Sequence, residues 1–213
     1  APDYTIATTD VPVGIQTNQE ADENMLKSDF LFFKQSRFVP DTDLSGGKVN
    51  IELQHVLSKL TLTIKLGTEL NEPDVPLDNP ITELKINGTA IAGTINFNTA
   101  ENTEDGNVPS VITTGAAGTV SPRYIEYNKA GDKTQQGSVK YDCILIPQTV
   151  ETGFTVSFKV GAKNYEWVSP NAVELQPCTA HTLTLLAGKE VVLVGNITAG
   201  EWQEGTGQNI TTD

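Results

Sequence analysis

The amino-acid sequence predicts an all-β protein built of two packed β-sandwich domains. Three observations lead to this prediction: apolar and polar residues alternate along several short segments, turn-forming residues separate these segments, and the 3.6-residue period of an amphipathic helix is almost absent. Alternation with a period of two is the pattern of a strand that has one buried face. Many short strands between turns are typical of a sandwich or a barrel.

The clearest strand is expected over residues 49–57, where one face is formed by Val49, Ile51, Leu53, His55 and Leu57. From residue 60 to residue 64 the aliphatic side chains stand on even numbers instead of odd ones. The buried face therefore changes between Ser58 and Lys59. A β-bulge, or a strand that passes from one sheet to the other, would produce this change.

Further strands are expected at Ile81–Ile86, Gly93–Phe97, Val139–Ile146, Phe154–Val160, Tyr165–Val168, His181–Leu186 and Val191–Val194. Turns are expected between them, because Gly and Asn readily adopt the conformations that tight turns need. The predicted turns are Asn87-Gly88, Glu104–Gly106, Gly161–Asn164 and Gly195-Asn196. Residues 19–27 resemble a helix weakly, and we expect a surface loop or a single turn there.

The length of 213 residues is sufficient for two domains of ordinary size. Residues 99–120 are rich in Thr, Gly, Asn and Ala and show no alternation, which is typical of a linker. We therefore expect an N-terminal β-sandwich domain over residues 1–104 and a C-terminal β-sandwich domain over residues 105–213.

The net charge of −13 argues against nucleic acid as a partner, because the field of the protein repels phosphate. No apolar run approaches the ~20 residues that span a bilayer, so we expect membrane attachment only through a lipid anchor outside this chain. The start at Ala1 without Met looks like a mature chain whose export signal lay upstream. The two cysteines, Cys143 and Cys178, could form one disulfide bridge or remain two buried thiols.

No catalytic constellation is recognisable. No local motif connects His55 or His181 to a nucleophile, and no thiol-protease signature surrounds Cys143. The sequence therefore predicts a protein that is not an enzyme and needs no cofactor.

One segment has the ligand spacing of a calcium loop. Asp41, Asp43 and Ser45 are followed by Glu52 at the twelfth position. An EF-hand needs a helix on each side of such a loop, whereas Pro40 precedes it and a predicted strand follows. A polar turn between two strands is the interpretation that the sequence favours, and a calcium-stabilised domain is the alternative.

The aromatic residues Tyr165, Trp167 and Trp202 could form a platform on which a glycan stacks. Tyr165 and Trp167 share one face of a predicted strand, which is also what an inward-facing core position requires. Packing in the core is the favoured interpretation, and a ligand site formed by these aromatic residues is the alternative.

Four sequence motifs resemble the fimbrillin and Mfa-like family of Bacteroidetes. The segment Asp29–Phe33 and the long apolar segment Val49–Ile64, which contains His55-Val56-Leu57-Ser58-Lys59-Leu60, are similar to two consecutive elements of that family. In the second half, Cys143–Val150 with its Pro147-Gln148 pair, and Gly200-Glu201-Trp202, resemble two further elements. The resemblance extends in order over residues 28–202.

This resemblance implies two transthyretin-like Greek-key sandwiches and a fimbrial subunit or surface lipoprotein at the outer membrane. It implies that other fimbrial subunits are partners, through a donor strand that replaces a cleaved first strand; host or bacterial surface ligands are further candidate partners. A donor strand should alternate apolar residues, but residues 203–213 contain only Ile210 among polar residues and glycines. We therefore expect an accessory, tip or anchor subunit instead of a self-polymerising stalk, with a surface glycan-binding protein as the alternative.

Overall fold

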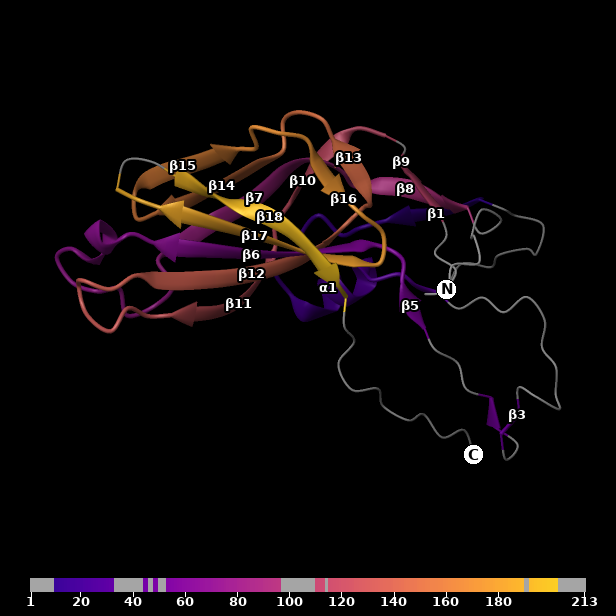
Figure 1. The fold of residues 1–213 in the computed structure, drawn as a ribbon, viewed down its shortest axis with the longest axis horizontal. Coiled ribbons are helices and arrows are strands. Elements are labelled where there is room, and N and C mark those ends of the chain that lie inside the picture. Colours follow the sequence, from indigo (N-terminus) through magenta and orange to yellow (C-terminus); the bar gives the residue numbers. More distant parts are fainter. Residues whose placement is uncertain are drawn as a thin grey trace.

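The part of the chain that the structure describes consists mainly of β-strands, as the sequence predicts. A computed structural model describes residues 10–32, 44–45, 48–49, 53–96, 110–113, 115–189 and 192–202. Most strands gather in an elongated sandwich, with α1 and a smaller sheet at one end of it (Figure 1). No helix among these residues has the length and apolar character needed to cross a bilayer.

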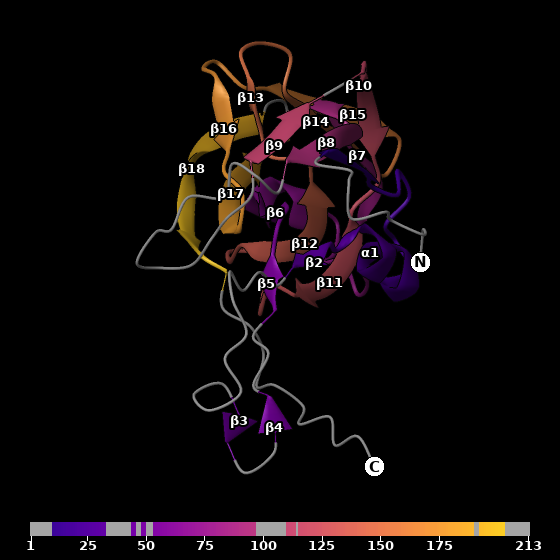
Figure 2. The ribbon, with the colours of Figure 1, turned by 90° about the vertical axis from the view of Figure 1, so that its right-hand side faces the viewer.

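Two sheets form the layers of the sandwich. The first has the strand order β11 (Arg123–Asn128), β12 (Gly137–Leu145), β6 (Ser58–Leu66), β17 (Thr179–Ala187) and β18 (Val192–Glu201). The second has the order β10 (Ala117–Val120), β7 (Ile81–Ala90), β14 (Thr155–Val160) and β15 (Lys163–Val168). Seen end-on, the two layers lie one above the other (Figure 2).

Strand β6 lies at the centre of the five-stranded sheet and supplies much of the core. It pairs antiparallel with β12 on one side and parallel with β17 on the other. Its even-numbered apolar residues Leu60, Leu62, Ile64 and Leu66 are at most 1% exposed, as the alternation of the sequence predicts. The prediction of one strand over residues 49–57 is wrong, because β5 spans only Gln54–His55 and Leu53, expected on the buried face, is 43% exposed. The chain leaves the strand after β5, where the consecutive residues Val56 and Leu57 are both fully buried, so the irregularity expected between Ser58 and Lys59 lies before β6.

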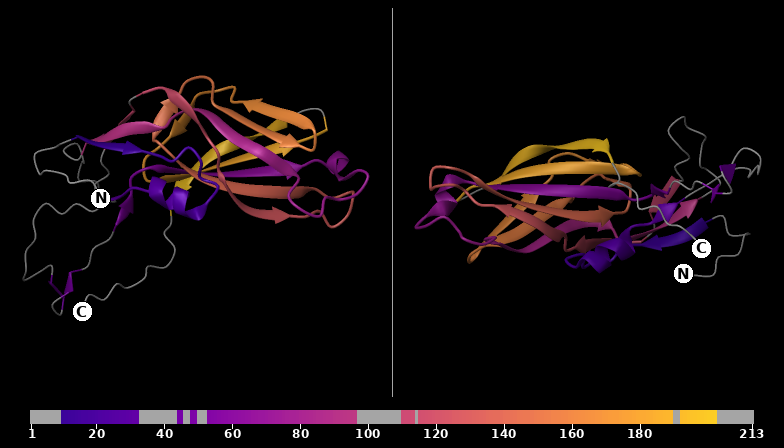
Figure 3. Two further views of the ribbon diagram at one scale, coloured as in Figure 1. Left: turned by 180° about the vertical axis from the view of Figure 1, so that it is seen from behind. Right: turned by 90° about the horizontal axis from the view of Figure 1, so that it is seen from below.

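A three-stranded sheet stands at one end of the sandwich, near α1 (Figure 3). Its order is β1 (Asp10–Gly14), β8 (Ala92–Asn96) and β9 (Ser110–Thr113). Strands β7 and β8 form one extended run that is interrupted at Ile91. Three short pairs complete the fold: β2 (Leu31–Phe32) with β5, β3 (Leu44–Ser45) with β4 (Lys48–Val49), and β13 (Gln148–Val150) with β16 (Val173–Leu175).

Seven predicted strands after residue 80 correspond to β7, β8, β12, β14, β15, β17 and β18. The turn at Gly161 is also confirmed, because Val160 pairs with Lys163 across a two-residue hairpin. Two other turn predictions are wrong. Asn87-Gly88 lies inside β7, where Gly88 has a φ of +90° and leaves no space for a Cβ beside the Gly153 carbonyl. Gly195-Asn196 lies inside β18, at a register shift against β17. The turn predicted at Glu104–Gly106 is outside the described residues.

The stretch predicted as a loop or single turn contains a real helix, α1 (Asp22–Ser28). Its sequence carries few apolar residues, but Met25 and Ser28 are buried on the side that faces the sandwich. Asp22 and Glu23 lie in the first turn and Lys27 in the last, which is favourable for the helix dipole.

The predicted separation at residues 104 and 105 does not divide the hydrogen-bonded sheets. Strands β6 and β7 lie before this point, yet they pair with β12, β14 and β17, which follow it. Buried residues from both sides belong to one hydrophobic cluster. The residues before and after the predicted boundary therefore share a core, and the prediction that each part closes its own core must be corrected.

Candidate functional site

A cleft of about 480 Å³ opens along one side of the sandwich, between the β15–β16 segment and β18. This volume is in the range of small-molecule sites in proteins. The residues that line it are Trp167, Ser169, Pro170, Asn171, Ala172, Val173, Glu174, Gln176, His181, Ile197, Thr198 and Ala199.

The floor of the cleft is the inward-facing surface of the β17–β18 pair. His181 pairs with Ala199, and Leu183 pairs with Ile197. His181 and Leu183 are at most 1% exposed, so this face points into the sandwich, yet Ile197 is only half-buried and Ala199 is exposed. The opposite layer does not cover β18 at this point, and the uncovered interlayer space is the cleft.

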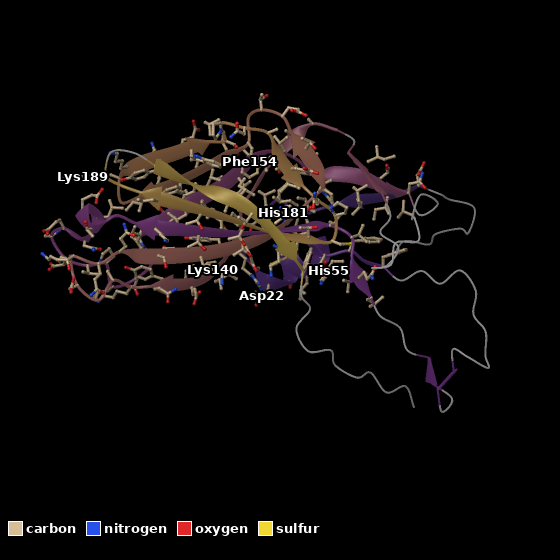
Figure 4. All side chains as sticks on the ribbon, viewed as in Figure 1. Asp22, His55, Lys140, Phe154, His181 and Lys189 are labelled. Atoms are coloured by element: carbon tan, nitrogen blue, oxygen red, sulfur yellow. The ribbon has the colours of Figure 1, made fainter. Side chains whose placement is uncertain are left out.

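His181 lies at one end of the cleft, midway along the sandwich (Figure 4). The backbone N–H of Gln176 donates to its Nε2 at 3.0 Å, which places the ring proton on Nδ1. Burial lowers the pKa of His181 below its ordinary value, although the nearby Glu174 carboxylate opposes this. His181 is therefore a neutral, hydrogen-bonded residue near pH 7.

Trp167 forms part of the cleft wall and is 5% exposed. Its ring meets Phe154 edge to face, with 6.2 Å between the ring centroids. The buried Nε1–H has no hydrogen-bond acceptor among the described residues. A buried donor without an acceptor costs roughly 1–3 kcal/mol, so this unpaired N–H is an unsatisfied polar group of the interior.

A second group of side chains joins the start of the chain to the end of β18. His55 Nδ1 lies 2.8 Å from Asp29 Oδ1, and the His55 ring stacks on Trp202 with 3.8 Å between centroids and 6° between planes. The Cys178 thiol donates to the backbone carbonyl oxygen of His55. Asp29 follows α1 directly and Trp202 follows β18 directly, so this group fastens two distant parts of the chain together.

Cys143 and Cys178 are both free thiols in the structure. Burial raises the pKa of Cys178 to about 11, and burial, with a smaller effect of Asp142, raises the pKa of Cys143 further. The reactive form of a cysteine is the thiolate, so both residues should be inert in the folded protein.

We expect the folded protein to react with a thiol-specific disulfide reagent at pH 8 roughly 100-fold more slowly than the urea-unfolded protein, because a pKa two units higher lowers the thiolate fraction about 100-fold. Folding raises both thiol pKa values, so the unfolding free energy should fall as the pH rises above about 9. Absorbance of the released reagent measures the rate. Failure to find two reactive thiols after unfolding would show that the cysteines are bridged.

The first strand, β1, forms an edge of the three-stranded sheet. All five of its residues pair with β8, and Val11 and Val13 are buried while the residues between them are exposed. Pro12 has no N–H to donate and fits such an edge position. Next along the chain, Ile15 is also buried, and residues 16–18 are exposed.

Gln19 fixes the chain immediately after this exposed stretch. Its side chain is fully buried, donates to the Ile144 carbonyl oxygen at 2.8 Å and accepts from the Ile144 N–H at 2.8 Å. The side-chain amide of Gln19 thus makes the two backbone hydrogen bonds that a neighbouring strand would otherwise make with Ile144.

The sequence-predicted site residues do not form one site. Asp41, Asp43 and Glu52 of the calcium-loop hypothesis lie outside the described residues, and only the backbone of Ser45 is described, in β3. No group of three metal-binding side chains occurs among the residues that the structure describes.

The aromatic residues of the stacking hypothesis are packed. Tyr165 and Trp167 are each 5% exposed, and Tyr165 stacks on Phe158. Trp202 is half-buried against His55. These three rings do not form an exposed flat platform, although Trp167 does contribute to the cleft.

The polar residues of the cleft rim and the Gln19 anchor were missed from the sequence. The rim residues Ser169, Asn171, Glu174 and Gln176 belong to a turn-rich stretch that gives no periodic signal. Gln19 is a single polar residue whose partner is 125 positions away. Of the residues that line the cleft, only Trp167 was identified from the sequence as a candidate ligand-binding residue.

A family model described as Fimbrillin-like matches residues 1–202. A crystal structure described as a candidate cell adhesion protein from Bacteroides uniformis is 19% identical, with a TM-score of 0.60, and the alignment covers 95% of this chain and 69% of that one. A similarly described protein from Bacteroides ovatus is 15% identical, with a TM-score of 0.61, 92% of this chain covered and 62% of that one. No curated protein matches the sequence. The structural likenesses show a common fold.

Proposed function

This chain belongs to the fimbrillin-like family, and on this premise we propose that it is a non-enzymatic subunit of surface fimbriae that acts in cell adhesion and joins its neighbours by β-strand addition. We place it at the outer membrane, held there through a lipid anchor or through other subunits. In strand addition, backbone hydrogen bonds supply affinity and alternate side chains fill pockets. The proposal therefore requires a strand position that a neighbour's segment can occupy.

Strand β1 is the observation that supports the proposal most directly. It lies at an edge, it is short, and it alternates buried Val11 and Val13 with exposed residues. An incoming segment of the same pattern could replace it by forming the same pairs with β8. If β1 left without replacement, the β8 edge and two apolar pockets would be exposed, which favours occupation by another segment.

We further propose an accessory, tip or anchor position in the fimbria. Residues 203–213 lack the apolar alternation that Val11 and Val13 provide in β1. A chain whose own segment cannot fill the β1 position of another copy would accept a strand from a different subunit.

A strand-exchange experiment tests the proposal. Residues 1–26 contain no Lys or Arg, so trypsin cannot cut between β1 and α1, and a site for a sequence-specific protease should be inserted at the exposed residues 16–18 of the full chain. We expect the cut protein to exchange β1 for a fluorescent peptide with the sequence of residues 10–16, and the uncut protein to bind none. Fluorescence anisotropy measures the uptake.

Two variant peptides provide the matched control. Val13→Asp places a charge in a buried position and should reduce uptake at least 10-fold, whereas Gln16→Asp adds the same charge at an exposed position and should bind normally. Equal binding by the cut and uncut proteins would refute strand addition at β1. Ladders of oligomers formed by the cut protein alone would refute the accessory role.

A further inference from the structure

The cleft beside β18 is a separate feature from the β1 position. It is lined by residues of β15, β16, β17 and β18 and the loop after β15, whereas β1 pairs with β8 in another sheet. Strands β15 and β18 are each the last strand of their sheet. The cleft thus opens where the edges of the two layers come together.

Hydrogen bonds join neighbouring segments on this side of the sandwich. The Lys163 ammonium and the Tyr165 hydroxyl both donate to the carbonyl oxygen of Lys189. The Gln176 N–H donates to His181, and Ser58 Oγ donates to the Gln176 carbonyl oxygen at 2.6 Å. Lys189 and His181 are well separated along the sandwich (Figure 4).

The chemistry of the lining combines apolar and uncharged polar groups. Apolar surface comes from Trp167, Val173, Ile197 and Ala199. The rim carries the hydroxyl group of Ser169 and the amides of Asn171 and Gln176. Such a set can donate to and accept from several ligand hydroxyl groups while an apolar surface receives the C–H faces of a ring.

The charge of the cleft narrows the ligand class. Glu174 is the only residue among the lining residues with a formal charge near pH 7, and no Lys or Arg lines the cleft. Gln176 Nε2 donates to Glu174 Oε1 at 3.2 Å, which orients the carboxylate. With a net charge of −13 on the whole protein, the site disfavours sulfated, phosphorylated or sialylated ligands.

We propose that this cleft binds a short, uncharged saccharide. Sugar hydroxyl groups donate to Glu174 and exchange hydrogen bonds with the amide and hydroxyl groups of the rim. The apolar residues of the lining, among them Trp167 and Ile197, receive the C–H face of the sugar ring.

Tryptophan fluorescence tests the proposal on the full, uncut chain. The protein has two tryptophans, so Trp202→Phe leaves Trp167 as the only reporter. We expect saturable changes in its emission with neutral di- or trisaccharides of glucose, mannose, galactose or N-acetylglucosamine, and none with sialylated or sulfated analogues. Isothermal titration of the unsubstituted protein with the same sugars gives a second measurement that does not depend on the fold of the variant.

Three substitutions locate the binding. Glu174→Gln should weaken it at least 10-fold, and its control Glu166→Gln, at an exposed β15 position outside the cleft, should leave it unchanged. Ala199→Phe should fill the cleft and abolish binding while the melting temperature stays within a few degrees. Absence of binding by every neutral sugar in both measurements would overturn the proposal. So would binding that Ala199→Phe leaves intact, or a cleft that takes up the β1 peptide instead.

Discussion

A Leu62→Ala variant should lose about 3 kcal/mol of unfolding free energy in a single cooperative transition. Leu62 is 1% exposed in β6, where it lies between Tyr141 of β12 and Leu183 of β17. Both neighbours are themselves buried, so the surroundings cannot easily close the cavity that the substitution leaves. Because the neighbours come from the second half of the chain, the substitution should destabilise the whole sandwich and not only its first half.

Thermal unfolding followed by calorimetry measures this effect. A loss of about 3 kcal/mol lowers the melting temperature by roughly 6–12 °C in a chain of this size. Lys65→Ala, at an exposed position of the same strand, should change the unfolding free energy by less than about 0.5 kcal/mol. If two transitions appeared and Leu62→Ala shifted only one, the two halves of the chain would be independent domains after all.

An Asp142→Ala variant should be destabilised by a similar amount, about 3 kcal/mol. The Asp142 side chain is 6% exposed and accepts two hydrogen bonds from Arg123, at 3.0 Å from Nε and 2.9 Å from Nη2. The Lys59 ammonium lies 3.5 Å away. Removal of the Asp142 carboxylate leaves the partly buried Arg123 and Lys59 without the anion that they share. The resulting loss of unfolding free energy is larger than the net stabilisation that the ion pairs provide.

Urea unfolding at low and high salt measures this second effect. Glu126→Ala is the matched control, because the Glu126–Lys140 pair joins the same two strands at 3.9 Å but is 49% and 43% exposed. Its loss should cost at most about 0.5 kcal/mol and should diminish further in salt. If Asp142→Ala were no more damaging than Glu126→Ala, the Arg123 contacts would have to be regarded as surface interactions.

The sequence predicted the long strands after residue 58 because alternation is a local property. The even-numbered residues of β6 and the odd-numbered residues of β15 are buried as their patterns indicate. Sheet order is not local: β6 pairs with β17, more than a hundred residues later, and nothing in either strand specifies this partner. The predicted division of the core failed for this reason, since a linker-like composition at residues 99–120 does not reveal that earlier strands pair with later ones.

Turns and sites were predicted less well because tertiary contacts override local preference. Gly88 resembles a turn residue, but it is needed inside β7 because the Gly153 backbone approaches there. The calcium-loop spacing has no described counterpart in the structure, and the three aromatic side chains are packed. The cleft arises because one layer does not cover the inward surface of β18, which depends on how the two sheets are superposed. No pattern in a single strand encodes that relation.

The contacts of His55 link the segment after α1 to Trp202, the last described residue. Asp29, just after α1, orients the His55 ring, and that ring holds the indole of Trp202. Any event that moves the chain before β2 breaks the contact between Asp29 and the His55 ring, on which the Trp202 indole stacks. A displacement of the segment after α1 would therefore be transmitted to the residue after β18 through a single imidazole.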